Sequence, residues 1–193
     1  MLNSMAAMAS AKGFARVTVG DVTRHAGVSR RTFYDQFVDK EDCFLAAFDA
    51  ISDRMQQATE QVLREAGGPW SARVRTALAA LLTLLRDEPA YGRVALVEVL
   101  SAGPISLQRR DALVDRFAVL FAPQQSPAPS AIGNDRRLAR AVVGGVYETL
   151  YQRIVGGELE RLPDLLPDLV YCVLVPYLGH FGALHERELV VAH

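Results

Sequence analysis

The side chains best suited to contact a polyanion lie close together, between residues 30 and 40. They are two arginines, two hydroxyl-bearing residues and a lysine: Arg30, Arg31, Thr32, Tyr34 and Lys40. An arginine can donate paired hydrogen bonds to the edge of a guanine. A hydroxyl group or an ammonium can hold phosphate oxygens without reading the base sequence. This set therefore indicates contact with double-stranded DNA.

Two short helices separated by a fixed turn would position these side chains. Thr18 and Asp21 have the spacing of a capping box, with Asp in place of the usual Glu, which predicts a helix that begins just after Thr18. Gly27 can adopt a positive φ and end that helix in a sharp turn. Ser29 can then cap a second short helix.

The second helix would be anchored through one face. Phe33 and Phe37 lie four residues apart, so both would point inward if the helix continues to Phe37. The polar and basic residues at its start would then face outward. This arrangement is a helix-turn-helix, whose second helix fits the major groove of DNA with its first residues near the bases.

The stretch from Gly13 to Phe48, GFARVTVGDVTRHAGVSRRTFYDQFVDKEDCFLAAF, resembles the DNA-binding region of the TetR family of bacterial transcription regulators. The shared features are Gly-Phe before a Thr-Val helix start, the Ala-Gly-Val-Ser turn, the Thr-Phe-Tyr-x-x-Phe pattern and a Lys-Glu pair that opens the next helix. The resemblance extends from Met1 to about Phe48, and we call residues 1–48 the head.

The resemblance implies a role for each residue of the matching motif. Thr32, Tyr34 and Lys40 would contact phosphates, while Arg30 and Arg31 would occupy the variable positions that read the sequence or bind phosphate. The predicted DNA-binding set also includes the two helix caps, Thr18 and Ser29. For residues 49–193 the family implies an all-helical body that forms dimers and often binds a small molecule.

Charge is distributed in agreement with a DNA-binding head. Residues 1–40 contain six Lys and Arg against three Asp, so 6 − 3 = +3. The rest of the chain has 15 basic and 19 acidic residues, so 15 − 19 = −4, and the whole chain has a net charge of −1. A basic head on an acidic body suggests that only the head meets a polyanion.

Helical punctuation recurs along the chain, and alternating strand-like runs are nearly absent. Apolar residues spaced by three and four predict helices over most of the body, and Gly and Pro residues separate them. We expect an all-α fold of about nine helices, divided into a DNA-binding domain (1–48) and a ligand-binding and dimerisation domain (49–193). The segment 123–133, PQQSPAPSAIG, is predicted to be a loop.

Two long helices near the C-terminus are the predicted dimer interface. One spans residues 134–155, and the other begins near Pro163 and is kinked or ended at Pro176. Their apolar stripes would pair with those of a second copy in a four-helix arrangement. The alternative is that they only complete the core of one chain. The interface candidates are Val142, Gly145, Val146, Leu150, Leu169, Val173 and Tyr177.

A small-molecule pocket would lie among the central helices, from Val74 to about Phe121. Its polar candidates, which stand in apolar surroundings, are Tyr91, Arg93, Glu98, Tyr147 and Tyr151. Glu98 is the sharpest candidate, since a buried carboxylate is costly without a partner. The alternatives are that Glu98 is exposed or paired with an arginine at an interface, and that the tyrosines are core residues.

Other chemistries have little support in the sequence. The four histidines are too scattered for a helical metal pair, and no dinucleotide-binding, P-loop or nucleophile-elbow motif occurs, so we expect no metal, no cofactor and no enzymatic activity. Cys43 and Cys172 are predicted to be small buried hydrophobes, in keeping with a reducing cytoplasm. No apolar run has the roughly 18 residues of a membrane span.

Two functions from different classes follow. The first is a ligand-responsive, homodimeric regulator, a repressor, which binds a palindromic operator and is released by a small-molecule effector. The second is a helical small-molecule-binding protein or enzyme whose head does not bind DNA. A degenerate head would lose its polar motif residues, and this sequence keeps them, which favours the first function.

Overall fold

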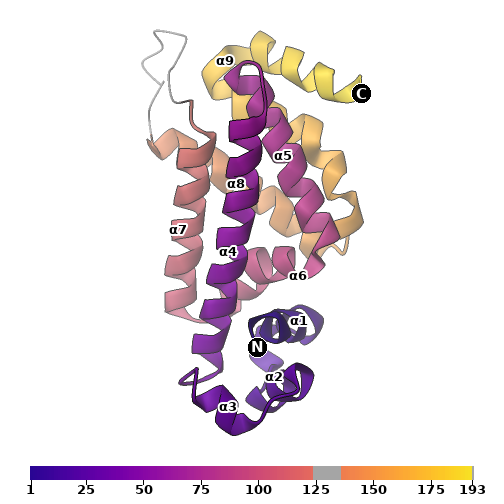
Figure 1. The fold of residues 1–193 in the computed structure, drawn as a ribbon. Helices are drawn as coiled ribbons and strands as arrows, with labels where there is room; N and C mark the ends of the chain where they lie inside the picture. Colours follow the sequence, from indigo (N-terminus) through magenta and orange to yellow (C-terminus); the bar gives the residue numbers. More distant parts are fainter. Residues whose placement is uncertain (124–135, 193) are drawn as a thin grey trace. The chain divides into compact units, whose positions relative to one another are not determined.

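The computed structural model describes residues 1–123 and 136–192, and over these residues the chain forms nine α-helices and no strand (Figure 1). The predicted all-α fold class is therefore confirmed. The α-helices are α1 (Leu2–Lys12), α2 (Val19–Ala26), α3 (Arg30–Tyr34), α4 (Lys40–Glu65), α5 (Trp70–Asp87), α6 (Pro89–Gly92), α7 (Pro104–Phe121), α8 (Arg136–Val155) and α9 (Leu166–Val191). The loop predicted over residues 123–133 lies, apart from Pro123, outside the described residues.

The chain divides into two compact units. Unit 1 consists of Met1–Arg54 and Glu88–Asp111, and unit 2 consists of Met55–Asp87 and Ala112–His193. The helices α4 and α7 each contribute to both units. The helix α4 continues without a break past residue 48. The division into two domains at that residue stays a prediction.

An aromatic core holds the head together within unit 1. Phe14, Phe33, Phe44 and Phe48 are buried, and the ring centroids of Phe14 and Phe44 lie 4.5 Å apart. The helix α1 packs on α2, and α2 packs on α3. Figure 1 shows these three helices gathered at the N-terminal end of α4. Burial of each such side chain stabilises the head by about 1.5–3 kcal/mol.

The second part of unit 1 contains an irregular helical segment. The four residues of α6 continue into a π turn, η2 (Arg93–Val97), and then into a 3-10 turn, η3 (Glu98–Ser101). Both α6 and η2 pack against α1 of the head. Because π and 3-10 turns wind the chain differently from an α-helix, they change the direction in which the following side chains point.

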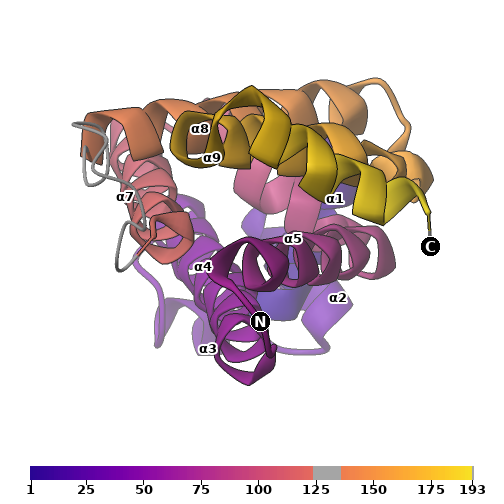
Figure 2. The same cartoon turned by 90° about the horizontal axis from the view of Figure 1, so that it is seen from above.

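The core of unit 2 lies between α5, α8 and α9. The helix α9 packs against both α5 and α8, and Figure 2 shows α8 and α9 side by side. Leu78, Leu82, Ile154 and Leu174 are almost completely buried. The buried Glu186 carboxylate of α9 accepts hydrogen bonds from α5, which fastens the C-terminal part of α9 to unit 2.

The last helix starts later than predicted and bends near the predicted place. A 3-10 segment, η4 (Leu159–Leu165), precedes α9, and the helical backbone is interrupted at Gly179, three residues beyond Pro176. Gly179 has a φ of 71°, which a residue without a Cβ adopts readily.

By length and composition, Leu159–Val191 is also the one candidate membrane span among the described residues. The core helix of a globular unit passes the same test, and 28 % of the most apolar stretch of this segment is buried inside the chain.

Candidate nucleic-acid interface

A reciprocal pair of hydrogen bonds holds the start of α2. The Asp21 amide donates to Thr18 Oγ1 at 3.2 Å, and the Thr18 amide donates to Asp21 Oδ2 at 3.0 Å. Lys12, in the last turn of α1, pairs with the same carboxylate at 2.8 Å. The hydrogen bonds from Lys12 and Thr18 hold the pKa of Asp21 well below its usual range. The predicted capping box is confirmed, and it also ties α1 to α2.

The turn between α2 and α3 has the predicted glycine geometry. Gly27 lies in the left-handed region, with φ 67° and ψ 29°, and the Val28 amide donates to the Thr23 carbonyl at 3.0 Å. Ser29 Oγ then accepts a hydrogen bond from the Thr32 amide at 3.0 Å. These bonds satisfy backbone groups at both helix ends and fix the path of the chain.

Phe33 anchors α3 as expected, whereas the helix itself is shorter than predicted. Phe33 is fully buried, and its ring centroid lies 5.4 Å from that of Phe37, which is half-buried. The helix α3 ends at Tyr34, although the Phe37 amide still donates to the Phe33 carbonyl at 2.9 Å. The segment to Phe37 is therefore one α-helical turn followed by a tight turn.

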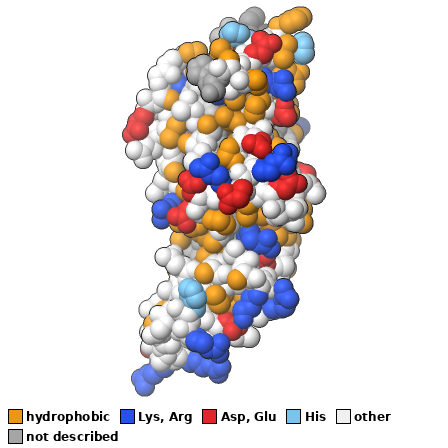
Figure 3. Space-filling model, turned by 90° about the vertical axis from the view of Figure 1, so that its right-hand side faces the viewer, with side chains coloured by type: hydrophobic (Ala, Val, Ile, Leu, Met, Phe, Trp, Pro, Cys, Tyr) orange, Lys and Arg blue, Asp and Glu red, His pale blue; other side chains and the backbone are white. Residues whose placement is uncertain are grey.

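The predicted DNA-contact side chains surround this anchor on the outside. Arg30 and Arg31 are exposed, Tyr34 is 58 % exposed and Thr32 is half-buried. In the space-filling view, Lys and Arg side chains gather on the part of the surface that the head forms, at the bottom of Figure 3. The surface around α3 thus presents positive charge and a phenol hydroxyl to the outside.

Arg30 lies back over α2. A Cβ added to Gly20 would come within 3.1 Å of Arg30 Nη2, so the guanidinium occupies the space that this glycine leaves open. The two arginines at the start of α3 consequently differ in their surroundings, although both are exposed. Of the two, Arg30 is the one whose guanidinium fills the space beside Gly20.

Lys40 holds the backbone of the head. Its Nζ lies 3.2–3.5 Å from the carbonyl oxygens of Phe14, Ala15 and Val17, and 4.7 Å from the centroid of the Phe14 ring. These carbonyls belong to η1 (Phe14–Arg16) and to the residue that follows it. The half-buried ammonium therefore joins the start of α4 to the connection between α1 and α2.

The predicted ligand residues are divided between the two units. Tyr91, Arg93 and Glu98 lie in unit 1, whereas Tyr147 and Tyr151 lie on α8 in unit 2. Tyr147 is buried and Tyr151 is half-buried.

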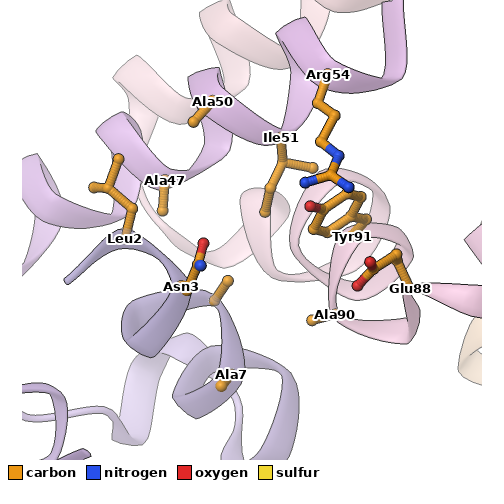
Figure 4. A pocket seen from close by; sticks show the side chains of 11 residues that line it. Leu2, Asn3, Ala7, Ala47, Ala50, Ile51, Arg54, Glu88, Ala90 and Tyr91 are labelled. Atoms are coloured by element: carbon orange, nitrogen blue, oxygen red, sulfur yellow. The ribbon is translucent and has the colours of Figure 1, made fainter. Parts of the chain in front are cut away.

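Of the five, Tyr91 lines the described cavity in unit 1, whose volume is about 380 Å³. Figure 4 shows this cavity between α1, α4 and α6, with Arg54 extended over the ring of Tyr91 and Glu88 at the same end. The Arg54 guanidinium carbon lies 5.4 Å from the centroid of that ring. The rest of the lining consists of the Asn3 amide and of small and aliphatic side chains: Leu2, Ala6, Ala7, Ala47, Ala50, Ile51 and Ala90.

Glu98 is buried, and its hydrogen-bond partner is a backbone amide of the head. The side chain accepts a hydrogen bond from the Phe14 amide at 2.7 Å, and Arg93 Nη2 lies 3.6 Å from its other oxygen. Glu98 is only 7 % exposed, which corrects the alternative reading that it is a solvent-exposed residue. Its backbone partner lies 84 residues away in the sequence, a relation that no local spacing could indicate.

Four of the predicted dimer-interface residues belong to the core of the single chain. Val146, Leu150, Leu169 and Val173 are buried without any second copy, because α8 and α9 pack against each other and against the rest of unit 2. Those four assignments are corrected. The other three are accessible: Gly145 is exposed, while Val142 and Tyr177 are half-buried.

The two cysteines have different surroundings. Cys43 is fully buried in the head, and burial raises the pKa of its thiol to about 11. Cys172 is exposed on α9, so the prediction that it is a buried hydrophobe was wrong. Its apolar neighbours in the sequence belong to other faces of the helix, and an apolar run does not reveal which face is outward.

Two basic residues of this region were not singled out from the sequence. Lys12 pairs with Asp21, nine positions along, and the head has no periodic pattern that links them. Arg54 follows Ala47, Ala50 and Ile51 at helical spacing, so the same α4 face carries all four residues. That spacing was available in the sequence, but nothing in it marked this face as bordering a cavity.

A comparison with protein families identifies the family of the head. Residues 2–47 match the family described as bacterial regulatory proteins, tetR family. The head belongs to the TetR family of bacterial regulators. The match covers α1, α2, α3 and the first turns of α4, including every element that surrounds the exposed basic side chains.

Solved structures share the fold of this chain well beyond the head. The fatty acid degradation regulator FadR from Bacillus halodurans superposes with a TM-score of 0.77 at 16 % identity, over 90 % of this chain and 95 % of that one. The transcriptional regulator FadR from Bacillus subtilis, in complex with stearoyl-CoA, gives 0.77 at 17 %, over 92 % and 96 %. A TetR-like regulator from Rhodococcus sp. RHA1 gives 0.62 at 20 %, over 90 % and 93 %.

Proposed function

We propose that this TetR-family chain is a ligand-responsive repressor that binds a palindromic operator as a cytoplasmic homodimer and is released by a small-molecule effector. The observation that carries the proposal is the capped α2–turn–α3 unit. One buried phenylalanine anchors it, and Arg31 and Tyr34 stand exposed on its outer side. A short, rigid helix presented in this way can enter a major groove.

The exposed side chains divide the work of recognition. Arg31 reads a base edge, and Arg30, which lies against Gly20, binds phosphate or a base beside it. Thr32 and Tyr34 hold phosphates through their hydroxyls. The caps Thr18 and Ser29 place backbone amides at the helix starts. Lys40 adds positive charge and keeps α4 joined to η1.

Selection of bound DNA from random oligonucleotides tests the proposed function. A palindromic site is expected, with half-sites about one helical turn (~34 Å) apart, because a symmetric dimer presents two copies of α3 to successive major grooves. Binding should weaken steeply as salt increases, since arginine contacts to phosphates release counterions. A purified protein that ignores DNA at low ionic strength would contradict the proposal.

The effector proposal is supported by the cavity between α1, α4 and α6. A volume of about 380 Å³ lies at the small end of the range for small-molecule sites. Its small and aliphatic side chains, together with the Asn3 amide and the Arg54–Tyr91 pair, suit a compact molecule with an apolar body and a polar group. The FadR relative from Bacillus subtilis was solved with stearoyl-CoA, which makes an acyl compound a reasonable first probe.

Operator release measures the effector directly. Stearoyl-CoA and octanoate, a shorter and more compact acid, are added to the protein on its selected DNA, and the loss of bound DNA is recorded. Release by octanoate that Tyr91→Ala abolishes would support the cavity as the site. Release that Tyr91→Ala leaves unchanged would place the effector elsewhere in the protein.

A further inference from the structure

The connection between α1 and α2 is held at both ends by charged side chains from distant parts of unit 1. At its start, the Phe14 amide donates to Glu98 Oε2 at 2.7 Å. At its end, the Val17 carbonyl accepts from Lys40 Nζ at 3.2 Å. A carboxylate thus holds a donor and an ammonium holds an acceptor of the same short segment. Since only Val17 and Thr18 separate η1 from α2, these two bonds set where the α2–α3 unit begins.

The turn at Gly13 directs the next backbone amide toward the Glu98 carboxylate. Gly13 has a φ of 80°, and a Cβ built on it would lie 3.6 Å from Glu98 Oε2. The chain turns sharply here, after α1, and the amide of the next residue points at the carboxylate. Because Glu98 is only 7 % exposed, water cannot easily replace the hydrogen bond if the two groups separate.

Glu98 stands at the point where the helical winding changes. It is the first residue of η3, directly after the π turn of η2, and Val97, the last residue of η2, has φ −111° and ψ −61°. A change from π to α winding over these residues would rotate the following side chain around the helix axis. The position of the Glu98 carboxylate therefore depends on how residues 93–97 are wound.

Arg93 completes the link. Its Nη2 lies 3.6 Å from Glu98 Oε1, so one carboxylate oxygen faces the guanidinium while the other faces the head. The arginine offsets part of the cost of burying the charge, and its own position in the first turn of η2 connects it with α6. The buried Glu98 carboxylate thus contacts Arg93 of η2 through one oxygen and Phe14 of η1 through the other.

We propose that Glu98 is the positioning residue through which the α6–η2–η3 segment sets the orientation of the DNA-reading α2–α3 unit. This assignment rests on the proposed function of the head. A buried carboxylate keeps its donor or loses it, because an intermediate separation leaves both groups unsatisfied. The link therefore transmits movement of residues 88–98 to η1 as a switch between two arrangements.

Amide hydrogen exchange tests the link without DNA. Glu98→Gln keeps the size of the side chain and removes its charge, and Glu98→Asp keeps the charge but shortens the reach by one methylene. Both are expected to raise the exchange rate of peptides covering residues 13–17 by at least about tenfold, while α5 keeps its protection. Glu186→Gln, a change at another buried carboxylate, should leave residues 13–17 at the wild-type rate.

The same variants, selected on random DNA, test the consequence for recognition. Wild-type protein should select one half-site spacing, and both Glu98 variants should accept a broader set of spacings, whereas Glu186→Gln should select the wild-type spacing. Unchanged exchange at residues 13–17 in Glu98→Asp and Glu98→Gln would overturn the assignment. If the wild-type protein selects no DNA, the proposed function fails, while the exchange result still decides whether Glu98 holds η1.

Discussion

At the scale of single residues, hydrogen bonds between residues three positions apart determine where the helices α2 and α3 of the head begin. Thr18 with Asp21, and Ser29 with Thr32, are local pairs, and their spacing in the sequence is sufficient to predict both helix starts. The partner of Glu98 was beyond such reasoning, since it is a backbone amide on a remote segment. The residue type indicated that a buried Glu98 carboxylate needs a partner, and only the folded chain shows that this partner is the Phe14 amide.

Substitutions of Tyr34 and of Arg31 should weaken DNA binding in different ways. Tyr34→Phe removes one phosphate contact from an exposed ring and should weaken binding to all sequences by about 0.5–1.5 kcal/mol. Arg31→Ala should cost about 1–3 kcal/mol at one base position and relax the preference there. Titration of the variants against the selected site and against single-base changes of it gives both quantities. Equal losses on every sequence would contradict the division of labour.

Cys43 should be chemically inert in the folded protein. Burial raises the pKa of its thiol to about 11, so at pH 8 little of the reactive thiolate forms and the reagent cannot reach it. In a Cys172→Ser variant, iodoacetamide should add no label to the native chain and one label in denaturant, as read by mass spectrometry. Rapid labelling of the native variant would show that the head opens.

Asp21 should make the stability of the head depend on acid. Its pKa is lowered in the folded chain, so its contribution is complete above the unfolded pKa of about 3.9 and is lost as the pH falls toward the folded pKa. Asp21→Asn should therefore lower the melting temperature at pH 7, and this difference should shrink below about pH 4. Asp35→Asn, at the exposed end of α3, is the control and should show no such trend.

At the scale of elements, the sequence predicted the presence of helices better than their outer faces. Val146 and Leu150 on α8 and Leu169 and Val173 on α9 form apolar stripes, which were assigned to a dimer interface and proved to be core. Apolar periodicity marks a buried stripe and does not say what buries it. The π and 3-10 turns at residues 93–101 were also beyond prediction, because no residue there signals a change in winding.

At the scale of the whole molecule, the proposed homodimer must use the faces of α8 and α9 that unit 2 leaves open. Gly145 and Cys172 are exposed on those helices, and Val142 and Tyr177 are half-buried. The resemblance of the head to its family predicted a dimer, and the packing of unit 2 restricts which residues can form it. The two copies of α3 can bind the two halves of one palindromic operator only if the chain forms this homodimer.

Gly145→Arg should separate the two copies without harming either one. A Cβ at Gly145 would meet no atom within 4 Å, so the single chain has room for a larger side chain, and replacing glycine within α8 favours the helix. Sedimentation at micromolar concentration should show a dimer for the wild type and a monomer for this variant. Ala112→Arg, also at an exposed helical position, is the control and should remain dimeric.

The chain has only two side-chain amines, Lys12 and Lys40, and each one fastens a joint inside the head. Acetylation of either amine would release that joint: Lys12 from the carboxylate at the start of α2, or Lys40 from the carbonyls of η1. The arginines that face outward carry no amine for this reaction. Acetyl groups would thus loosen the reading unit from within while its outer guanidinium groups kept their charge.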